Sequence, residues 1–257
     1  MGLIKFVKNK RIKRENAYTI RMTKKMIKTL INRTLLVCLL LSLNFGLLTT
    51  ISAVGEIPYT VVIDAGHGGM DGGVTGRRTG IKESDVNLSL SKALCSSLSE
   101  FGFNVTMTRE TTSGICGEDG TWYKKEDMQK RKEIIQKTNP TFVLSVHQNF
   151  YPASELTRGG QVFYLRGNED GKRLAQSLQQ ALNEFYGELG AKPREAMAAD
   201  YYLLSCVESP AVIVECGFLS NPQDEQILAS SNGRKRIAQV ITKGIAAYCG
   251  LNEESRG

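Results

Sequence analysis

The chain has 257 residues, enough for one α/β domain with residues to spare. Its formal net charge of +7 comes from the amino terminus. Residues 1–34 carry eleven Lys or Arg and one acid, whereas the rest of the chain carries 22 basic and 25 acidic side chains. The basicity belongs to a tail, so the overall charge gives no support to a nucleic-acid-binding fold, and we expect no nucleic-acid partner.

The basic tail at 1–34 precedes an apolar segment at 35–54, which predicts export with the amino terminus in the cytoplasm. Its first 14 residues are strongly apolar, the length of a signal-peptide core, and its 20 residues together could cross a bilayer. The long basic flank favours an uncleaved signal anchor over a cleaved signal peptide. In both cases we expect the remainder to work outside the cytoplasm, as a linker at 55–58, a domain at 59–250 and a tail at 251–257.

The six cysteines are widely spaced, and no two are separated by only two residues. This spacing indicates neither a cysteine-zinc motif nor a dense disulfide framework. One disulfide could form in an exported protein, but the sequence does not identify its partners.

Beyond Pro58, runs rich in Val, Ile, Phe, Tyr or Thr alternate with helical patterns. We interpret 110–125 and 187–200 as loops. Strands that alternate with helices predict an α/β fold, in which a mostly parallel twisted sheet is flanked by helices on both faces of a single catalytic domain. In chain order, the predicted elements are a strand at 59–64, a helix at 84–101, a strand at 103–108, a helix at 126–137, strands at 141–147 and 160–165, a helix at 169–187, a strand at 211–215 and a helix at 234–249.

Four side chains that can bind a metal or move a proton lie at the ends of these elements. His67 follows the first strand in a glycine-rich turn, and His147 and Glu215 end two later strands. Glu83 precedes the first helix. Ligands bind beyond the carboxyl ends of parallel strands, so we expect these four residues to converge. Two imidazoles and one carboxylate form a common catalytic zinc site, beside which a second carboxylate could carry protons.

Each of these residues also has an ordinary explanation when taken alone. His67 could sit in a structural turn, and Glu83 could simply favour the helix dipole. Glu215 ends an apolar strand, where a salt bridge to Arg109 or Arg131 would be sufficient to compensate its charge. The occurrence of all four together favours a metal-dependent hydrolase.

The motifs around these residues resemble those of the zinc-dependent N-acetylmuramoyl-L-alanine amidases. The resemblance covers about residues 59–250, and within that family the chain is most similar to the compact spore-cortex amidases of endospore formers. The matching motifs are Asp-Ala-Gly-His-Gly-Gly at His67, Lys-Glu-Ser-Asp-Val-Asn-Leu at Glu83, Ser-Val-His-Gln-Asn at His147, Val-Glu-Cys-Gly-Phe-Leu-Ser-Asn-Pro at Glu215, and Thr-Arg at Arg109.

The resemblance implies that one zinc ion is held by His67, Glu83 and His147, and that Glu215 is the catalytic carboxylate. Metal-bound histidines usually donate their second N–H to an oxygen, so Asp71 is a candidate to orient a histidine ring. Asn149 and Arg109 are further candidate supporting residues. Cys216 beside Glu215 is disfavoured as a nucleophile, because both histidines are better used as ligands.

The reaction implied by this resemblance is hydrolysis of the amide between N-acetylmuramic acid and L-alanine in peptidoglycan. In the spore cortex it would remove stem peptides, and an accessory protein could control it. The alternatives are a general cell-wall amidase in cell separation or lysis, a zinc peptidase or deacetylase of the same polymer, and a non-catalytic peptidoglycan-binding regulator.

Overall fold

The computed structural model describes residues 21–35, 59–115 and 124–251. Contacts divide the chain into two units, Met1–Gly55 and Glu56–Gly257. In the first, residues 21–35 are helical with exposed side chains. Almost all of the predicted anchor or signal segment at 35–54, and the linker at 55–58, lie outside the described residues. Within the described ranges, no helix is both long and apolar enough to cross a membrane.

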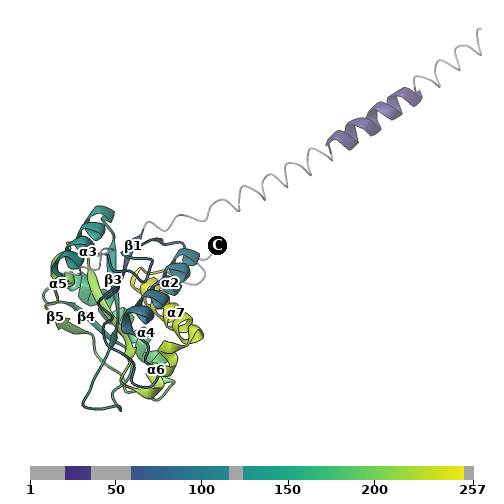
Figure 1. Cartoon of the computed structure of the whole chain (residues 1–257). Coiled ribbons are helices and arrows are strands. Elements are labelled where there is room, and N and C mark those ends of the chain that lie inside the picture. The colour runs from purple at the N-terminus through teal and green to yellow at the C-terminus, as the bar shows by residue number, and fades with distance from the viewer. Residues whose placement is uncertain (1–20, 36–58, 116–123, 252–257) are drawn as a thin grey trace, which may run out of the picture. The chain divides into compact units, whose positions relative to one another are not determined.

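The second unit is built on a six-stranded sheet (Figure 1). Its strands are β1 (Thr60–Ala65), β2 (Asn104–Met107), β3 (Phe142–Asn149), β4 (Gln161–Leu165), β5 (Met197–Ala199) and β6 (Ala211–Phe218). Their spatial order is β2-β1-β3-β6-β4-β5. The four strands from β2 to β6 in this order are parallel, whereas β4 runs antiparallel to β6 and parallel to β5. The prediction of a mostly parallel sheet is confirmed.

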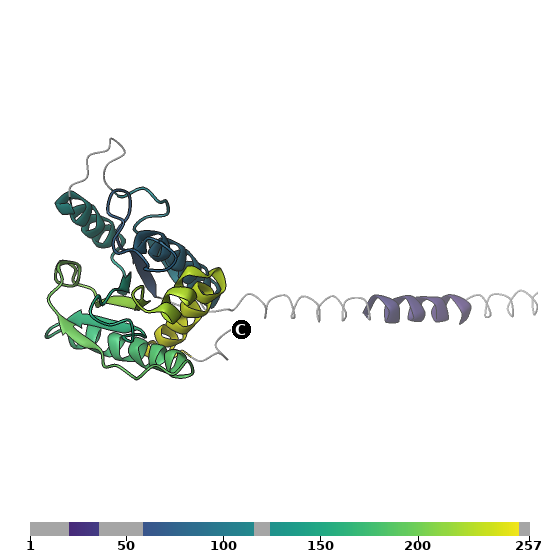
Figure 2. The ribbon, with the colours of Figure 1, turned by 60° about the horizontal axis from the view of Figure 1, so that its bottom comes forward.

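Helices cover both faces of this sheet, as predicted (Figures 1 and 2). The larger core lies under α2, α4 and α7, and the smaller one lies under α3 and α5. The helix α6 follows β6 and packs against α7. The helices are α2 (Glu83–Phe101), α3 (Lys124–Thr138), α4 (Glu169–Gly187), α5 (Tyr202–Ser205), α6 (Pro222–Ala229) and α7 (Ser231–Tyr248).

The apolar periodicity of α4 shows why the larger core forms where it does. Leu174, Leu178 and Leu182 recur on one helical face and are fully buried. At the start of the helix, the Asn168 side chain accepts a hydrogen bond from Gly171 N, which satisfies one of the free amides of the first turn. The predicted bounds of this helix, 169–187, match the structure.

Several elements differ from the prediction. The strand β5 and the helix α5 are only three and four residues long, too short for a periodic pattern, and β5 lies within the stretch interpreted as a loop at 187–200. The helix α6 was also missed, although Asn221 caps it and Pro222 occupies its first turn. Among the described cysteines, Cys95, Cys206, Cys216 and Cys249 are all free thiols.

Strand alternation places Asp64, Ser145, His147 and Glu215 on the face covered by α3 and α5. Their apolar neighbours, such as Val146 and Val214, point into the larger core. The side chains that face the smaller core share register across three strands, Asp64 with Ser145, Ser145 with Ile213, and His147 with Glu215. The sheet therefore presents a polar strip at the carboxyl ends of its parallel strands.

Candidate active site

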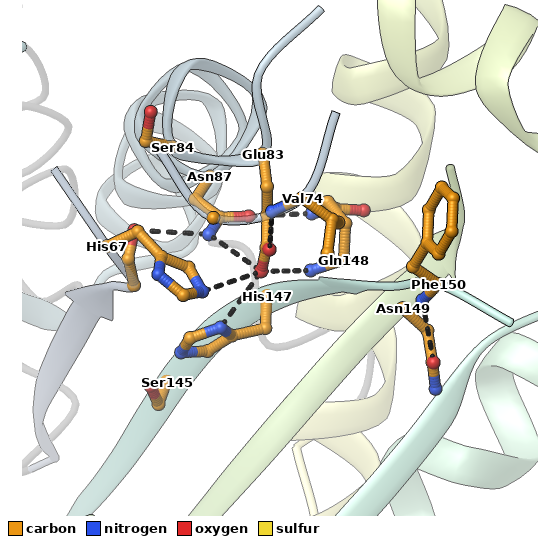
Figure 3. A network of polar contacts seen from close by, with 12 residues as sticks. His67, Val74, Glu83, Ser84, Asn87, Ser145, His147, Gln148, Asn149 and Phe150 are labelled. Carbon is orange, nitrogen blue, oxygen red and sulfur yellow. Dashed lines mark hydrogen bonds and ion pairs between the residues drawn. The ribbon is translucent and has the colours of Figure 1, made fainter. Parts of the chain in front are cut away.

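His67 lies two residues beyond β1 and has a left-handed backbone conformation, with φ of 59°. Its ring is oriented by Asp71, whose Oδ2 lies 2.8 Å from His67 Nδ1. The other carboxylate oxygen of Asp71 accepts a hydrogen bond of 3.1 Å from the backbone amide of Gly73. With Nδ1 occupied in this way, Nε2 of His67 is directed toward Glu83 (Figure 3).

Glu83 is the first residue of α2, and one oxygen of its carboxylate meets both histidines. Its Oε1 lies 3.2 Å from His67 Nε2 and 3.1 Å from His147 Nδ1. The backbone amide of Gln148 donates to the same oxygen, and that of Val74 donates to Oε2, at 3.1 and 3.0 Å (Figure 3). The carboxylate is thus held by the main chain on two sides and is only 3% exposed.

His147 extends from β3, and its ring packs edge-on against that of His67 with centroids 4.9 Å apart. The backbone of Gly66 passes directly against this ring: a Cβ added there would fall well inside contact distance of the imidazole. The glycine in the Asp-Ala-Gly-His motif is therefore needed for the two histidine-bearing segments to approach each other.

The three side chains form a donor set that fits zinc. One ligand atom from each of His67, Glu83 and His147 lies within 4.8 Å of the others. Zinc binds imidazole nitrogen and carboxylate oxygen at about 2.0–2.2 Å in a tetrahedron, which puts neighbouring donors about 3.3 Å apart. The two separations at Glu83 Oε1, 3.2 and 3.1 Å, are close to that spacing.

The charges of these groups are strongly coupled. Burial alone would lower the pKa of His67, but hydrogen bonds and negative charge from Glu83 and Asp71 outweigh it and raise that pKa to about 9. Burial alone would raise the pKa of Glu83, but its contacts with His147 and His67 hold it well below its usual range. Glu83 is therefore an ionised carboxylate that attracts a cation to this position.

Glu215 stands beside the donor set without joining it. It is the register partner of His147 on the neighbouring parallel strand, so both side chains leave the same face of the sheet. Its Oε2 is buried with no hydrogen-bond partner among the described residues. Burial raises the pKa of Glu215 to about 7, an effect that the nearby histidines oppose and the charge of Glu83 reinforces. A carboxylate with this pKa can accept and release a proton near neutral pH.

The ordinary explanation for Glu215, a salt bridge to Arg109 or Arg131, is not what the structure shows. Arg131 pairs instead with Asp64 and Asp127. Arg109 donates to main-chain carbonyls of the His67 loop and of the first turn of α2. The candidate proton carrier is consequently left without a structural ion pair to either arginine.

The remaining sequence candidates lie in different places. Arg109 reaches the carbonyls of Ala65, Gly66 and Ser84 at 2.9, 3.0 and 2.9 Å, so it connects the backbone next to two of the donors. Asn149 ends β3, where its side chain accepts a hydrogen bond from Phe150 N.

The thiol of Cys216 is fully buried in the larger core, on the other side of the strand from Glu215. Burial raises the pKa of this thiol, which opposes formation of a thiolate. The location and the raised pKa both argue against a nucleophilic role.

The sequence analysis did not identify the residues that form hydrogen bonds to the donor set and to the backbone beside it. Asn87, one helical turn after Glu83, donates from Nδ2 to the carbonyl of Gly66 at 3.1 Å and to Glu83 Oε1 at 3.4 Å. Its Oδ1 accepts from Gln148 Nε2. The spacing of four residues between Glu83 and Asn87 indicates that both side chains lie on one face of the helix, and this pattern could have identified Asn87. Asp64 likewise ends an apolar strand, where a buried carboxylate requires partners.

A cavity of about 280 Å³ opens next to the donor set, on the sheet face covered by α3 and α5. Its lining includes the polar side chains of Asp64, Ser145 and the two histidines, together with the aromatic side chains of Tyr201 and Tyr202. A lining that combines polar side chains with apolar and aromatic ones is typical of a site that binds and orients an organic ligand.

A histidine–carboxylate donor set beside the buried Glu215 and a cavity, in an α/β fold, is the arrangement expected of a metal-dependent hydrolase. Residues 61–247 match the family model for N-acetylmuramoyl-L-alanine amidase, and the chain belongs to that family. Its members are hydrolases of an amide in peptidoglycan. The resemblance seen in the sequence motifs is thereby confirmed.

Individual relatives agree with this family. The germination-specific N-acetylmuramoyl-L-alanine amidase of Bacillus subtilis is 31% identical over 197 residues, which cover 76% of this chain and 80% of the relative. Among solved structures, the CwlD amidase of Clostridioides difficile, in complex with the GerS lipoprotein, superposes with a TM-score of 0.70 at 31% identity. That match covers 76% of this chain and all of the other. An N-acetylmuramoyl-L-alanine amidase from Clostridium difficile 630 gives a TM-score of 0.65 at 26% identity, covering 75% of this chain and 97% of the other.

Proposed function

We propose that the chain is a zinc-dependent amidase with one ion bound by His67, Glu83 and His147. The observation that carries this proposal is the meeting of two imidazole nitrogens at a single oxygen of the ionised Glu83. The main-chain amides that hold Glu83 leave its carboxylate preorganised to bind a cation. When bound there, zinc supplies polarisation of the substrate carbonyl and activation of water near neutral pH.

Glu215 is proposed to move the protons of the reaction. As the base it takes a proton from the attacking water, and as the acid it returns that proton to the departing amine of L-alanine. Its unpartnered Oε2 and its pKa near 7 suit both steps. Because Glu215 and His147 are register partners, the proton carrier is held about one strand spacing from the donor set.

The proposed substrate bond is the amide that joins the lactyl group of N-acetylmuramic acid to L-alanine. The adjoining cavity, which Tyr201 and Tyr202 help to line, would hold substrate beside the donor set. Arg109 and Asp71 are proposed as supporting residues that hold the His67 loop and ring in place. Asn149 is proposed only to shape the end of β3.

The proposed biological role is removal of stem peptides during maturation of the spore cortex, outside the cytoplasm. Two relatives support it: the germination-specific amidase of Bacillus subtilis and the CwlD amidase, whose structure contains a lipoprotein. By analogy, an accessory protein is proposed as a partner of this chain. The segment at 35–54 is proposed to act as a signal anchor or a signal peptide.

Zinc content and turnover, measured on the purified full-length chain, test the enzymatic proposal. We expect one zinc per chain, loss of peptidoglycan hydrolysis with a chelator, and recovery on adding zinc. If the chain binds zinc and peptidoglycan but does not hydrolyse peptidoglycan, the result would favour a non-catalytic peptidoglycan-binding regulator.

The cortical role requires a separate test in spores. Removal of the whole stem peptide leaves bare muramic acid, which other enzymes can convert to its lactam. We expect the chain to restore muramic lactam to the cortex of a Bacillus subtilis strain that lacks its germination-specific amidase. If the cortex is not restored although the same chain hydrolyses purified peptidoglycan, the general cell-wall role is favoured.

A further inference from the structure

The helix α3 is attached to the sheet mainly through charged residues. Of its 15 residues, Asp127, Arg131 and Ile135 are buried. Arg131 is 2% exposed and donates from Nε to Asp127 at 2.6 Å and from Nη1 to Asp64 at 2.5 Å. A guanidinium this deeply buried needs all of its partners, so it holds α3 and β1 in a fixed relation.

The same guanidinium also reaches the main chain on both sides of the Gly66 turn. Arg131 Nη1 donates to the carbonyl of Ala65 at 3.0 Å, and Nη2 donates to the carbonyl of His67 at 2.7 Å. His67 has φ of 59°, a conformation that a residue with a side chain rarely adopts without support. Arg131 therefore contacts the main chain of His67 itself, the residue with the left-handed conformation and the first of the proposed zinc ligands.

The carboxylate of Asp64 links this arginine to the second histidine. Its Oδ1 accepts from Arg131 and from Thr108 Oγ1, and its Oδ2 accepts from Ser145 Oγ at 2.6 Å. Ser145 is two residues before His147 on β3 and faces the same side of the sheet. The Asp64–Arg131 pair therefore connects the loop that carries His67 to the strand that carries His147.

We propose that Arg131 is a positioning residue for the metal site, setting the spacing of His67 and His147 through its bonds to Asp64 and to the His67 carbonyl. Its hydrogen bonds go to Asp64, Asp127 and two main-chain carbonyls, so it acts on the imidazoles through the backbone. Arg131 also lines the adjoining cavity, and zinc affinity measured without substrate reports its effect on the metal site alone. The inference rests on the proposed zinc site. It adds that α3, through Arg131, sets the affinity of this site for zinc.

The test is the zinc dissociation constant of the full-length chain, measured by competition with a chelating indicator. Arg131→Lys keeps a positive charge for Asp64 but loses the planar fork that reaches two carbonyls at once. We expect it to fold and to bind zinc about 10-fold to 100-fold more weakly, the usual effect of altering groups that orient metal ligands. Arg131→Met should weaken binding at least as much if it folds.

The matched control is Arg158→Lys. Arg158 also pairs with a buried carboxylate, Asp224, at 3.3 Å and donates to a main-chain carbonyl, that of Leu189. None of its contacts involves the three proposed ligands. We expect Arg158→Lys to bind zinc with wild-type affinity. Denaturant unfolding of both lysine variants measures their general stability, and we expect only Arg131→Lys to lose zinc affinity even if the two are equally stable.

Two results would overturn the inference: wild-type zinc affinity in Arg131→Lys, or an equal loss of affinity in the Arg158→Lys control. An Arg131→Lys chain that does not fold would also overturn it, because the role would then be general stability. Failure of the wild type itself to bind zinc would contradict the proposed function instead, so the two failures are distinguishable.

Discussion

His147 on β3 and Glu215 on β6 are direct register partners across two parallel strands. This one relationship places a proposed zinc ligand and a proposed proton carrier side by side on the same face of the sheet. Glu83 reaches the same point from the first turn of α2, and His67 reaches it from the loop after β1. The two glutamates have different proposed roles because Glu83 contacts both histidines, whereas Glu215 Oε2 has no hydrogen-bond partner among the described residues. Each role can be tested separately.

Replacing Glu215 should separate catalysis from metal binding. Glu215→Ala and Glu215→Gln are expected to lower turnover of peptidoglycan by about 10²–10⁴-fold, the contribution of a positioned acid or base. Both variants should retain zinc, since Glu215 is outside the donor set. Metal analysis and initial rates on the same preparation provide the check, and near wild-type rates would show that another group carries the proton.

Asp71→Asn should weaken zinc binding through the ring of His67. The carboxylate accepts from His67 Nδ1 at 2.8 Å and so leaves Nε2 facing the proposed metal position. An amide can still occupy this position but is a weaker partner, so we expect zinc affinity to fall about 10-fold to 100-fold. Asp170→Asn is the control, because Asp170 pairs with Arg173 on the exposed surface of α4. Equal affinities in the two variants would contradict the role of Asp71.

Gly66→Ala is expected to disrupt the meeting of the two histidines. The added methyl would overlap the ring of His147, and overpacking of this kind typically destabilises a fold by about 1–3 kcal/mol. We expect a lower unfolding midpoint together with weaker zinc binding. Gly187→Ala is matched to it, since a Cβ at the end of α4 would meet nothing within 4 Å. Wild-type zinc affinity in Gly66→Ala would show that the close approach is unnecessary.

The metal-free chain should lose stability as the pH rises through the pKa of His67. That pKa is raised from 6.5 to about 9, so the contacts of protonated His67 with Glu83 and Asp71 contribute fully below about pH 6.5. The contribution declines between pH 6.5 and 9 as the proton is lost. Denaturant unfolding of the chelator-treated chain across this range measures it. The decline should be smaller in His67→Gln, and an identical profile in that variant would contradict the assignment.

Features that depend on residues close together in the sequence were predictable, whereas features that depend on contacts between distant residues were not. Apolar periodicity identified α4 to the residue, and β-branched runs identified the parallel strands, because both patterns are repeated locally. The short elements β5 and α5 are stabilised by their neighbours rather than by a pattern of their own.

In the site, the histidines and glutamates were recognisable because the sequence places each near the end of an element that leads to the same edge of the sheet. The two strands run two to three residues further than predicted, so His147 and Glu215 lie inside β3 and β6 rather than at their ends. The partners of Arg131 were not, because its contacts with Asp64 and the His67 carbonyl span more than sixty residues of sequence. From the sequence, Glu215 at the end of an apolar strand was itself a candidate partner of Arg131. Only the folded arrangement shows that Asp64 takes this arginine and leaves Glu215 free of it.

The most direct measurement of the central claim is the identity of the groups released from purified peptidoglycan by the full-length chain. The account predicts new alanine amino termini that appear with zinc, disappear with a chelator, and are not accompanied by new reducing sugar ends. New reducing ends would instead show cleavage of the glycan and would contradict the assignment of the amide bond.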